Sequence, residues 1–180
     1  ARARYAVGID KENRGVYTHV VPLADRASVH IVDRIARLLW PFAIDPTAID
    51  LHLAFPLGDQ DVHNAYATVR APSSAVKIFG VNISGSDVSR MYSEEGIIAI
   101  VNHCMASHSQ IETVVMGAAQ HREMQERITR ATGARAIPPT PSFGVWAANI
   151  AQLDAFFTPD TSSVHLAAAF NIPSVVLYVH

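Results

Sequence analysis

The stretch that decides the fold is Lys77-Ile-Phe-Gly-Val-Asn-Ile83, which runs into the small, hydroxyl-rich loop Ser84-Gly-Ser-Asp-Val-Ser-Arg90. A nearly continuous apolar run of this length is typical of a strand that is covered on both faces in a parallel sheet. After the loop, Ser93 provides an N-cap and two glutamates follow it, where the helix dipole favours negative charge. The sequence therefore predicts a strand, a polar loop and a helix, in that order.

The same alternation continues to the C-terminus. We predict further strands at residues 111–116, 134–137, 154–158 and 174–179, separated by helices that end at Gly133, begin at Ser142 and span 163–170. Strands joined by helices of this length must pair in parallel, because the crossover needs a dozen or more residues. Residues 76–180 are therefore predicted to form an α/β domain, a Rossmann-like parallel sheet flanked by helices. We expect its strands, counted from residue 77, in the order 3-2-1-4-5.

Residues 1–75 are predicted to be an extension or connector. A short strand is expected around Val7, and apolar residues at helical spacing predict a helix from Ser28 to Trp40. Leu51, Leu53 and Phe55 alternate with other residues as in a strand, and the polar stretch 56–74 ends in a predicted hinge at 72–74. The chain begins without Met and stops directly after an apolar run, from which we expect a fragment of a longer product.

The composition narrows the function classes. Lys and Arg total 14 of 180 residues and the formal net charge is -2, so no broad basic face supports nucleic-acid binding. The single cysteine, Cys104, cannot form an internal disulfide. No run of about 18 apolar residues and no secretory signal is present, so a cytoplasmic location is expected. His103, His108 and His121 lack ligand spacing with other donors, so no metal site is expected.

Two loops are the candidates for chemistry. Ligands of open parallel sheets bind beyond the carboxyl ends of the strands, where the strand order reverses, and there the predicted order places loops 84–90 and 159–165. Both loops are rich in hydroxyls and lead into helices, whose N-termini present unpaired N–H groups to anions. Arg90 would add a bidentate positive charge. We therefore predict a site for an anionic, phosphate-bearing ligand.

Each feature also has an ordinary structural interpretation, which the sequence leaves open. The loop at 84–86 could be a simple turn, Asp160 or Thr161 could be N-caps alone, Arg90 could be a solvated charge, and His165 could lie at the edge of the core. Neither the P-loop pattern nor the dinucleotide-binding glycine pattern is present. What favours the site is that all of these residues fall at one predicted edge.

Three segments resemble a known family. Thr158-Pro-Asp-Thr-Ser-Ser-Val-His-Leu-Ala-Ala-Ala-Phe-Asn-Ile-Pro173 closely resembles the nucleotide-sugar motif of glycosyltransferase family 9, the ADP-heptose:lipopolysaccharide heptosyltransferases and their relatives. Val81-Asn-Ile-Ser-Gly-Ser86, with Arg90-Met-Tyr92 after it, is similar to the family's phosphate loop and its basic-x-aromatic segment, although Trp is usual where Tyr92 stands. Residues 28–39 are similar to the segment that enters the family's C-terminal domain.

The resemblance implies a GT-B fold, with residues 76–180 as the nucleotide-sugar-binding half and residues 1–75 as a remnant of the N-terminal domain and a connector. It implies transfer of a sugar from a donor such as ADP-heptose to a lipopolysaccharide core acceptor, without a cofactor, at the inner face of the inner membrane. The acceptor site and catalytic base would lie in the missing N-terminal domain, and Arg90 would stabilise the leaving group. The implied donor-binding residues are Ser84, Gly85, Ser86, Arg90, Gly117, Asp160, Thr161, Ser162, Ser163 and His165.

Two other functions remain open at this stage. Some members use an acidic residue after the position of Gly117 to hold the ribose, and Ala118-Ala-Gln120 stands there instead, which leaves base and sugar undetermined. A nucleotide-sugar 2-epimerase of similar fold would need no acceptor. A non-catalytic nucleotide-sugar-binding module would bind the donor and turn nothing over.

Overall fold

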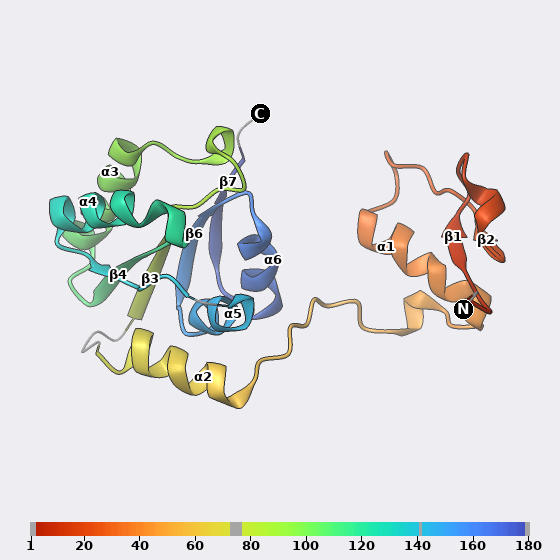
Figure 1. Ribbon diagram of the computed structural model, residues 1–180, viewed down its shortest axis with the longest axis horizontal. Helices are drawn as coiled ribbons and strands as arrows, with labels where there is room; N and C mark the ends of the chain where they lie inside the picture. The colour runs from red at the N-terminus through yellow and green to blue at the C-terminus, as the bar shows by residue number, and fades with distance from the viewer. Residues whose placement is uncertain (1–2, 73–76, 141, 179–180) are drawn as a thin grey trace. The chain divides into compact units, whose positions relative to one another are not determined.

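The computed structural model describes residues 3–72, 77–140 and 142–178. Its contacts divide the chain into two compact units, residues 1–52 and 53–180. The larger unit holds the predicted sheet (Figure 1).

The smaller unit is built around two short strands. β1 (Val7–Ile9) pairs in parallel with β2 (His19–Val21), and the short 3-10 turn η1 (Arg14–Val16) lies between them in the chain. β1 agrees with the strand predicted around Val7, whereas β2 was not predicted.

The helix predicted from Ser28 to Trp40 is shorter and changes type. α1 (Ile31–Ala36) begins after His30, whose Nδ1 accepts a hydrogen bond from the backbone N–H of Val32 at 3.3 Å, while the Ser28 hydroxyl donates to Asp25 instead. The chain continues as the 3-10 helix η2 (Arg37–Phe42), which ends at Ala43 in the left-handed conformation with φ 56°. A further 3-10 turn, η3 (Pro46–Ala48), follows.

Residues 53–72 belong to the larger unit, which the sequence did not suggest. The alternation at 51–55 forms no strand; instead α2 (Asp59–Ala65) follows and continues into the π-helical turn η4 (Tyr66–Arg70). The Arg135 guanidinium donates to the carbonyl oxygens of Thr68 and Val69 at 2.9 and 2.8 Å and so fastens this helix to the sheet. Of the predicted hinge, residues 73–74 lie outside the described residues.

The sheet has the predicted order. β3 (Lys77–Asn82), β4 (Ile111–Met116), β5 (Arg135–Ala136), β6 (Ala155–Pro159) and β7 (Ser174–Leu177) pair in parallel in the order β5-β4-β3-β6-β7. Counted from β3, this is the order 3-2-1-4-5, so the prediction of a parallel α/β sheet is confirmed. The reversal falls at β3, with β4 on one side and β6 on the other (Figure 1).

Two helices of the larger unit begin at serine caps that were predicted from the sequence. Ser93 caps α3 (Glu94–Ser107) and Ser142 caps α5 (Phe143–Ala151). α4 (Arg122–Thr132) ends at Gly133, whose φ of 77° is the left-handed conformation that glycine adopts most easily. α6 (Ser162–Ala169) completes the set, and the 3-10 turns η5 (Val88–Arg90) and η6 (Ala119–His121) precede α3 and α4.

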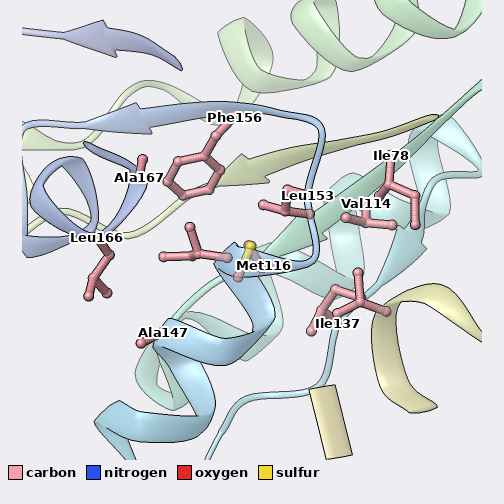
Figure 2. Packing of buried hydrophobic residues seen from close by; sticks show 11 residues of the cluster. Ile78, Val114, Met116, Ile137, Ala147, Leu153, Phe156, Leu166 and Ala167 are labelled. Atoms are coloured by element: carbon pink, nitrogen blue, oxygen red, sulfur yellow. The ribbon is translucent and has the colours of Figure 1, made fainter. Parts of the chain in front are cut away.

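Both faces of the sheet's central strands are buried, as the apolar strand sequences predicted. Successive strand residues point to opposite faces, so Phe156 lies in one core and Phe157 in the other. One core packs against η4, α5 and α6, and its buried residues are drawn in Figure 2. The other core packs against α3 and α4 through Ile97, Val101 and Ile128. Two helical layers therefore hold the strand ends in place.

No helix among the described residues is both long enough and apolar enough to cross a bilayer.

Candidate functional site

A buried amide joins the ends of the two central strands. Asn82, the last residue of β3, is 1% exposed, and its Nδ2 donates to the Thr158 hydroxyl of β6 at 2.9 Å. The same nitrogen donates to the Ser84 carbonyl at 3.2 Å, and Asn82 Oδ1 accepts from the Ser84 N–H at 3.0 Å. Asn82 thereby sets the direction in which the loop leaves the sheet. Sequence analysis did not single it out, because it lies within an apolar strand.

The loop after β3 is also fastened to the loop after β4. Ser84 Oγ accepts a hydrogen bond from the Ala118 N–H at 2.8 Å and lies 2.8 Å from His121 Nδ1. Gly117 makes this approach possible, since a Cβ at this position would lie 2.8 Å from Ile83 Cγ1 and 2.9 Å from Ser84 Oγ. Gly117 was predicted at the site, and the structure gives it this steric role.

The loop after β6 leads directly into α6. Thr161 is the N-cap, and its hydroxyl accepts from the Ser163 N–H at 3.2 Å. Ser163 is buried, and its own hydroxyl accepts from the indole N–H of Trp146 at 3.0 Å, which ties α6 to α5. The N-terminal turn of α6 is therefore fastened to α5.

These segments enclose one cavity of about 600 Å³ at the carboxyl ends of the strands. Its volume falls in the range of roughly 300–1,000 Å³ that is usual for small-molecule sites. Seven of the ten predicted site residues line it: Ser84, Gly85, Ser86, Gly117, Thr161, Ser162 and Ser163. The lining residues that the prediction did not include are Asn82, Ala118, Ala119, Thr140, Ser142, Phe143 and Trp146. The lining is thus rich in hydroxyls and also carries two aromatic side chains.

Arg90 and Asp160 meet beside this cavity but do not line it among the described residues. The Arg90 Nη1 lies 3.3 Å from Asp160 Oδ2, and its Nε lies 3.7 Å from Asp87 Oδ2. The Ser89 hydroxyl hydrogen-bonds to Asp87 and, with the Arg90 charge, lowers the pKa of that carboxyl. The positive charge of Arg90 is therefore shared between two carboxylates in the structure, and its side chain is about half exposed.

The structural interpretations of these loops are partly correct. Thr161 is an N-cap and also lines the cavity, so the two interpretations do not exclude each other. Asp160 does not cap α6; its carboxylate pairs with Arg90. His165 lies exposed on α6 and is not among the described residues that line the cavity. Its predicted role therefore has no geometric support of its own.

Metal ligands do not cluster in the described ranges: no group of three or more His, Cys, Asp or Glu side chains there is placed to hold an ion.

The fold and the site together define a class of protein domain. A parallel sheet with this order, carrying a cavity with hydroxyl side chains in its lining at the carboxyl ends beside its reversal point and helix N-termini at its rim, is the architecture of nucleotide-binding α/β domains. The sequence model of one family, described as glycosyltransferase family 9 (heptosyltransferase), matches residues 1–180. The chain belongs to this family.

Solved structures show the same fold at low sequence identity. The glycosyltransferase family 9 protein of Veillonella parvula DSM 2008 superimposes with a TM-score of 0.80 at 18% identity, over 99% of this chain and 52% of its own. The E. coli heptosyltransferase WaaC, solved with ADP-2-deoxy-2-fluoro heptose, gives 0.69 at 16% identity, over 89% and 48%. The E. coli ADP-heptose LPS heptosyltransferase II gives 0.69 at 18% identity, over 97% and 56%.

The chain thus spans about half the length of these solved relatives. Its five-stranded unit has the Rossmann-like form found in the GT-B fold of the family. None of the curated proteins matches the chain at a significant level.

Proposed function

We propose that this chain supplies the donor-binding half of a heptosyltransferase-like glycosyltransferase. The donor is a nucleoside diphosphate sugar such as ADP-heptose, and the acceptor is a sugar hydroxyl of the lipopolysaccharide core. The observation that carries the proposal is the cavity of about 600 Å³ where the loops after β3, β4 and β6 meet. Family membership and the ADP-sugar bound in the solved WaaC relative support it.

The cavity has suitable chemistry for a diphosphate. The hydroxyls of Ser84, Ser86, Thr161 and Ser162 lie among its lining residues, and the first turn of α6 supplies backbone N–H groups and partial positive charge. The aromatic side chains of Phe143 and Trp146 line the same cavity and offer a surface for a planar base. A ligand that has both polar groups and a flat apolar ring would thus find partners for each among the lining residues.

Arg90 is proposed to stabilise the departing diphosphate. As the sugar–phosphate bond breaks, negative charge develops on the leaving group, and a fixed guanidinium can hydrogen-bond to it with two N–H groups. For this, the side chain must turn from Asp87 and Asp160 toward the cavity, and its half-exposed position leaves it free to do so. In the proposed reaction Asp160 holds sugar hydroxyls, because its charge would repel a phosphate, and His165 donates to a phosphate or sugar oxygen.

The acceptor and the catalytic base are assigned to the N-terminal half of the family architecture. Residues 1–75 represent only a part of that half. No metal ion or cofactor is needed if Arg90 and the α6 N-terminus supply the stabilising charge. A lipopolysaccharide acceptor implies a cytoplasmic enzyme that works at the inner face of the inner membrane.

The binding step can be tested on the chain itself. Calorimetric titration with ADP, ADP-heptose and a UDP-sugar should show binding of the adenine ligands. Arg90→Ala should weaken ADP binding by about 10- to 100-fold, since a hydrogen-bonded charge pair contributes about 1.5–3 kcal/mol. Arg130→Ala, which removes an exposed arginine in the last turn of α4, is the matched control and should leave affinity unchanged. Equal affinities of the two variants would remove Arg90 from the site.

The chemical step requires a protein that also contains the acceptor-binding half. There Arg90→Ala should lower kcat by about 10² or more, because loss of one stabilising donor typically costs that much. Analysis of the products separates the other candidate functions. Release of an altered sugar without acceptor would indicate an epimerase, and binding without turnover would indicate a non-catalytic module.

A further inference from the structure

The hydroxyl of Ser84 is shared with a residue that lies behind the cavity. Ser84 lines the cavity, and its Oγ lies 2.8 Å from the backbone N of Ala118 and 2.8 Å from Nδ1 of His121. His121 is half-buried and does not line the cavity among the described residues. Its imidazole is connected to the cavity through the contact with Ser84.

The position of His121 is set by the backbone around it. The residue closes the 3-10 turn η6, with its N–H donating to the Ala118 carbonyl at 2.9 Å, and it is the N-cap residue of α4. Gly117, immediately before this turn, leaves room for Ser84 Oγ. The contact between Ser84 and His121 thus joins two loops that are both anchored in the sheet.

The number of hydrogen-bonding positions on the Ser84 hydroxyl shows how the protonation of His121 Nδ1 changes what Ser84 offers to the cavity. A serine hydroxyl has one donor and two acceptor positions, and the Ala118 N–H already occupies one acceptor position. If His121 Nδ1 is unprotonated, it accepts the only proton of Ser84, and the oxygen offers just a lone pair to the cavity. If Nδ1 carries a proton, it fills the second acceptor position of Ser84, and the serine proton is free to point into the cavity.

A phosphate oxygen accepts hydrogen bonds and donates none at full ionisation, so the two states differ in their affinity for it. A lone pair directed at an anion is repulsive, whereas an O–H group directed at it is attractive. A bound anion therefore selects the state in which His121 Nδ1 carries the proton.

We propose that His121 is a positioning residue that makes Ser84 a hydrogen-bond donor to the anionic part of the ligand. The inference rests on the proposed function, since it takes the cavity to hold a diphosphate. The ligand class it specifies is an acceptor-only anion at Ser84: a phosphoryl oxygen and not a sugar hydroxyl.

The deciding experiment is ¹⁵N NMR of the histidine side chains in the unaltered chain with ADP and with inorganic pyrophosphate. His121→Asn identifies the His121 signals by their loss. In the complex, His121 Nδ1 should give the chemical shift of a protonated ring nitrogen. An unprotonated Nδ1 in the ADP complex would overturn the inference and leave the proposed function intact.

Two substitutions give an independent measurement. His121→Asp offers only hydrogen-bond acceptors, so it takes the Ser84 proton and should weaken ADP binding by at least about tenfold, whereas His121→Asn can still donate from its amide and should stay within about threefold. Thermal melting establishes that each variant is folded, and if His121→Asp does not fold, the NMR result decides alone. Equal affinities for both folded variants would contradict the inference. If the unaltered chain binds neither ADP nor pyrophosphate, the proposed function fails and the inference fails with it.

Discussion

Two buried threonines show how hydrogen bonding at single residues supports the site. Thr158 is fully buried and its hydroxyl accepts from Asn82 and donates to the Pro159 carbonyl, whereas the buried Thr113 hydroxyl has no partner among the described residues. Thr158→Val should therefore lower the free energy of unfolding by about 1–3 kcal/mol, because the buried Asn82 amide loses its Thr158 partner and keeps only its hydrogen bonds with Ser84. Thr113→Val, the matched control, should be neutral or slightly stabilising. Urea unfolding of both variants measures the difference, and equal losses would contradict it.

Asp154 should make stability depend on pH in the acid range. Burial raises the pKa of its carboxyl, but the hydrogen bond from the Ile78 N–H and those from Lys77 and Arg70 outweigh burial, so the pKa is lowered overall. A carboxyl with a lower pKa in the folded chain stabilises it at pH values above about 3.9, the unfolded pKa, and this contribution is lost as pH falls through the folded pKa. Urea unfolding between about pH 6 and pH 2 should show this loss, and Asp154→Asn should reduce it. An unchanged pH profile in that variant would contradict the assignment.

At the scale of elements, the N-cap of α3, Ser93, is expected to contribute to the free energy of unfolding. The Ser93 hydroxyl accepts from the Gly96 N–H at 3.1 Å, and Ser93 is not among the described residues that line the cavity. Ser93→Ala should lower the free energy of unfolding by about 1 kcal/mol, and Ser93→Asp should retain it, since both serine and aspartate are good N-caps. ADP affinity should not change in either variant. A loss of stability in Ser93→Asp equal to that in Ser93→Ala would show that the cap is not responsible.

At the scale of the whole molecule, the division at residues 52 and 53 assigns α2 and η4 to the sheet unit. Ala65 and Val69 are fully buried there, and the Val69 carbonyl accepts from Arg135. A chain of residues 53–180 should therefore fold cooperatively and bind ADP within about threefold of the entire chain. A chain of residues 77–180 should be less stable by at least about 2 kcal/mol, because it uncovers one core and leaves Arg135 without its acceptors. Circular dichroism melts and calorimetry compare the two, and equal stability would place the boundary near residue 75 instead.

Much of the sheet unit was predictable because its signals are local. Apolar runs, N-capping serines and Gly133 each act within a few residues, and the rules for parallel crossovers then leave few possible strand orders. α2 and η4 were missed because each has a single buried residue, Ala65 and Val69 respectively, so the segment lacks an apolar stripe. Its helix is held by contacts with α5 and Arg135, and those come from distant parts of the chain.

The sequence by itself determined the parallel α/β sheet, the two loops at its reversal point and the residue types suited to an anion, because periodicity, capping and loop composition are properties of neighbouring residues. Only the tertiary structure decided how these groups act together. It brought Asn82 to Thr158, His121 to Ser84 and Trp146 to Ser163, and it gave Arg90 two carboxylate partners. Side-chain hydrogen bonds and ion pairs of this kind depend on the packing of elements that are far apart in the chain, and no local pattern encodes them.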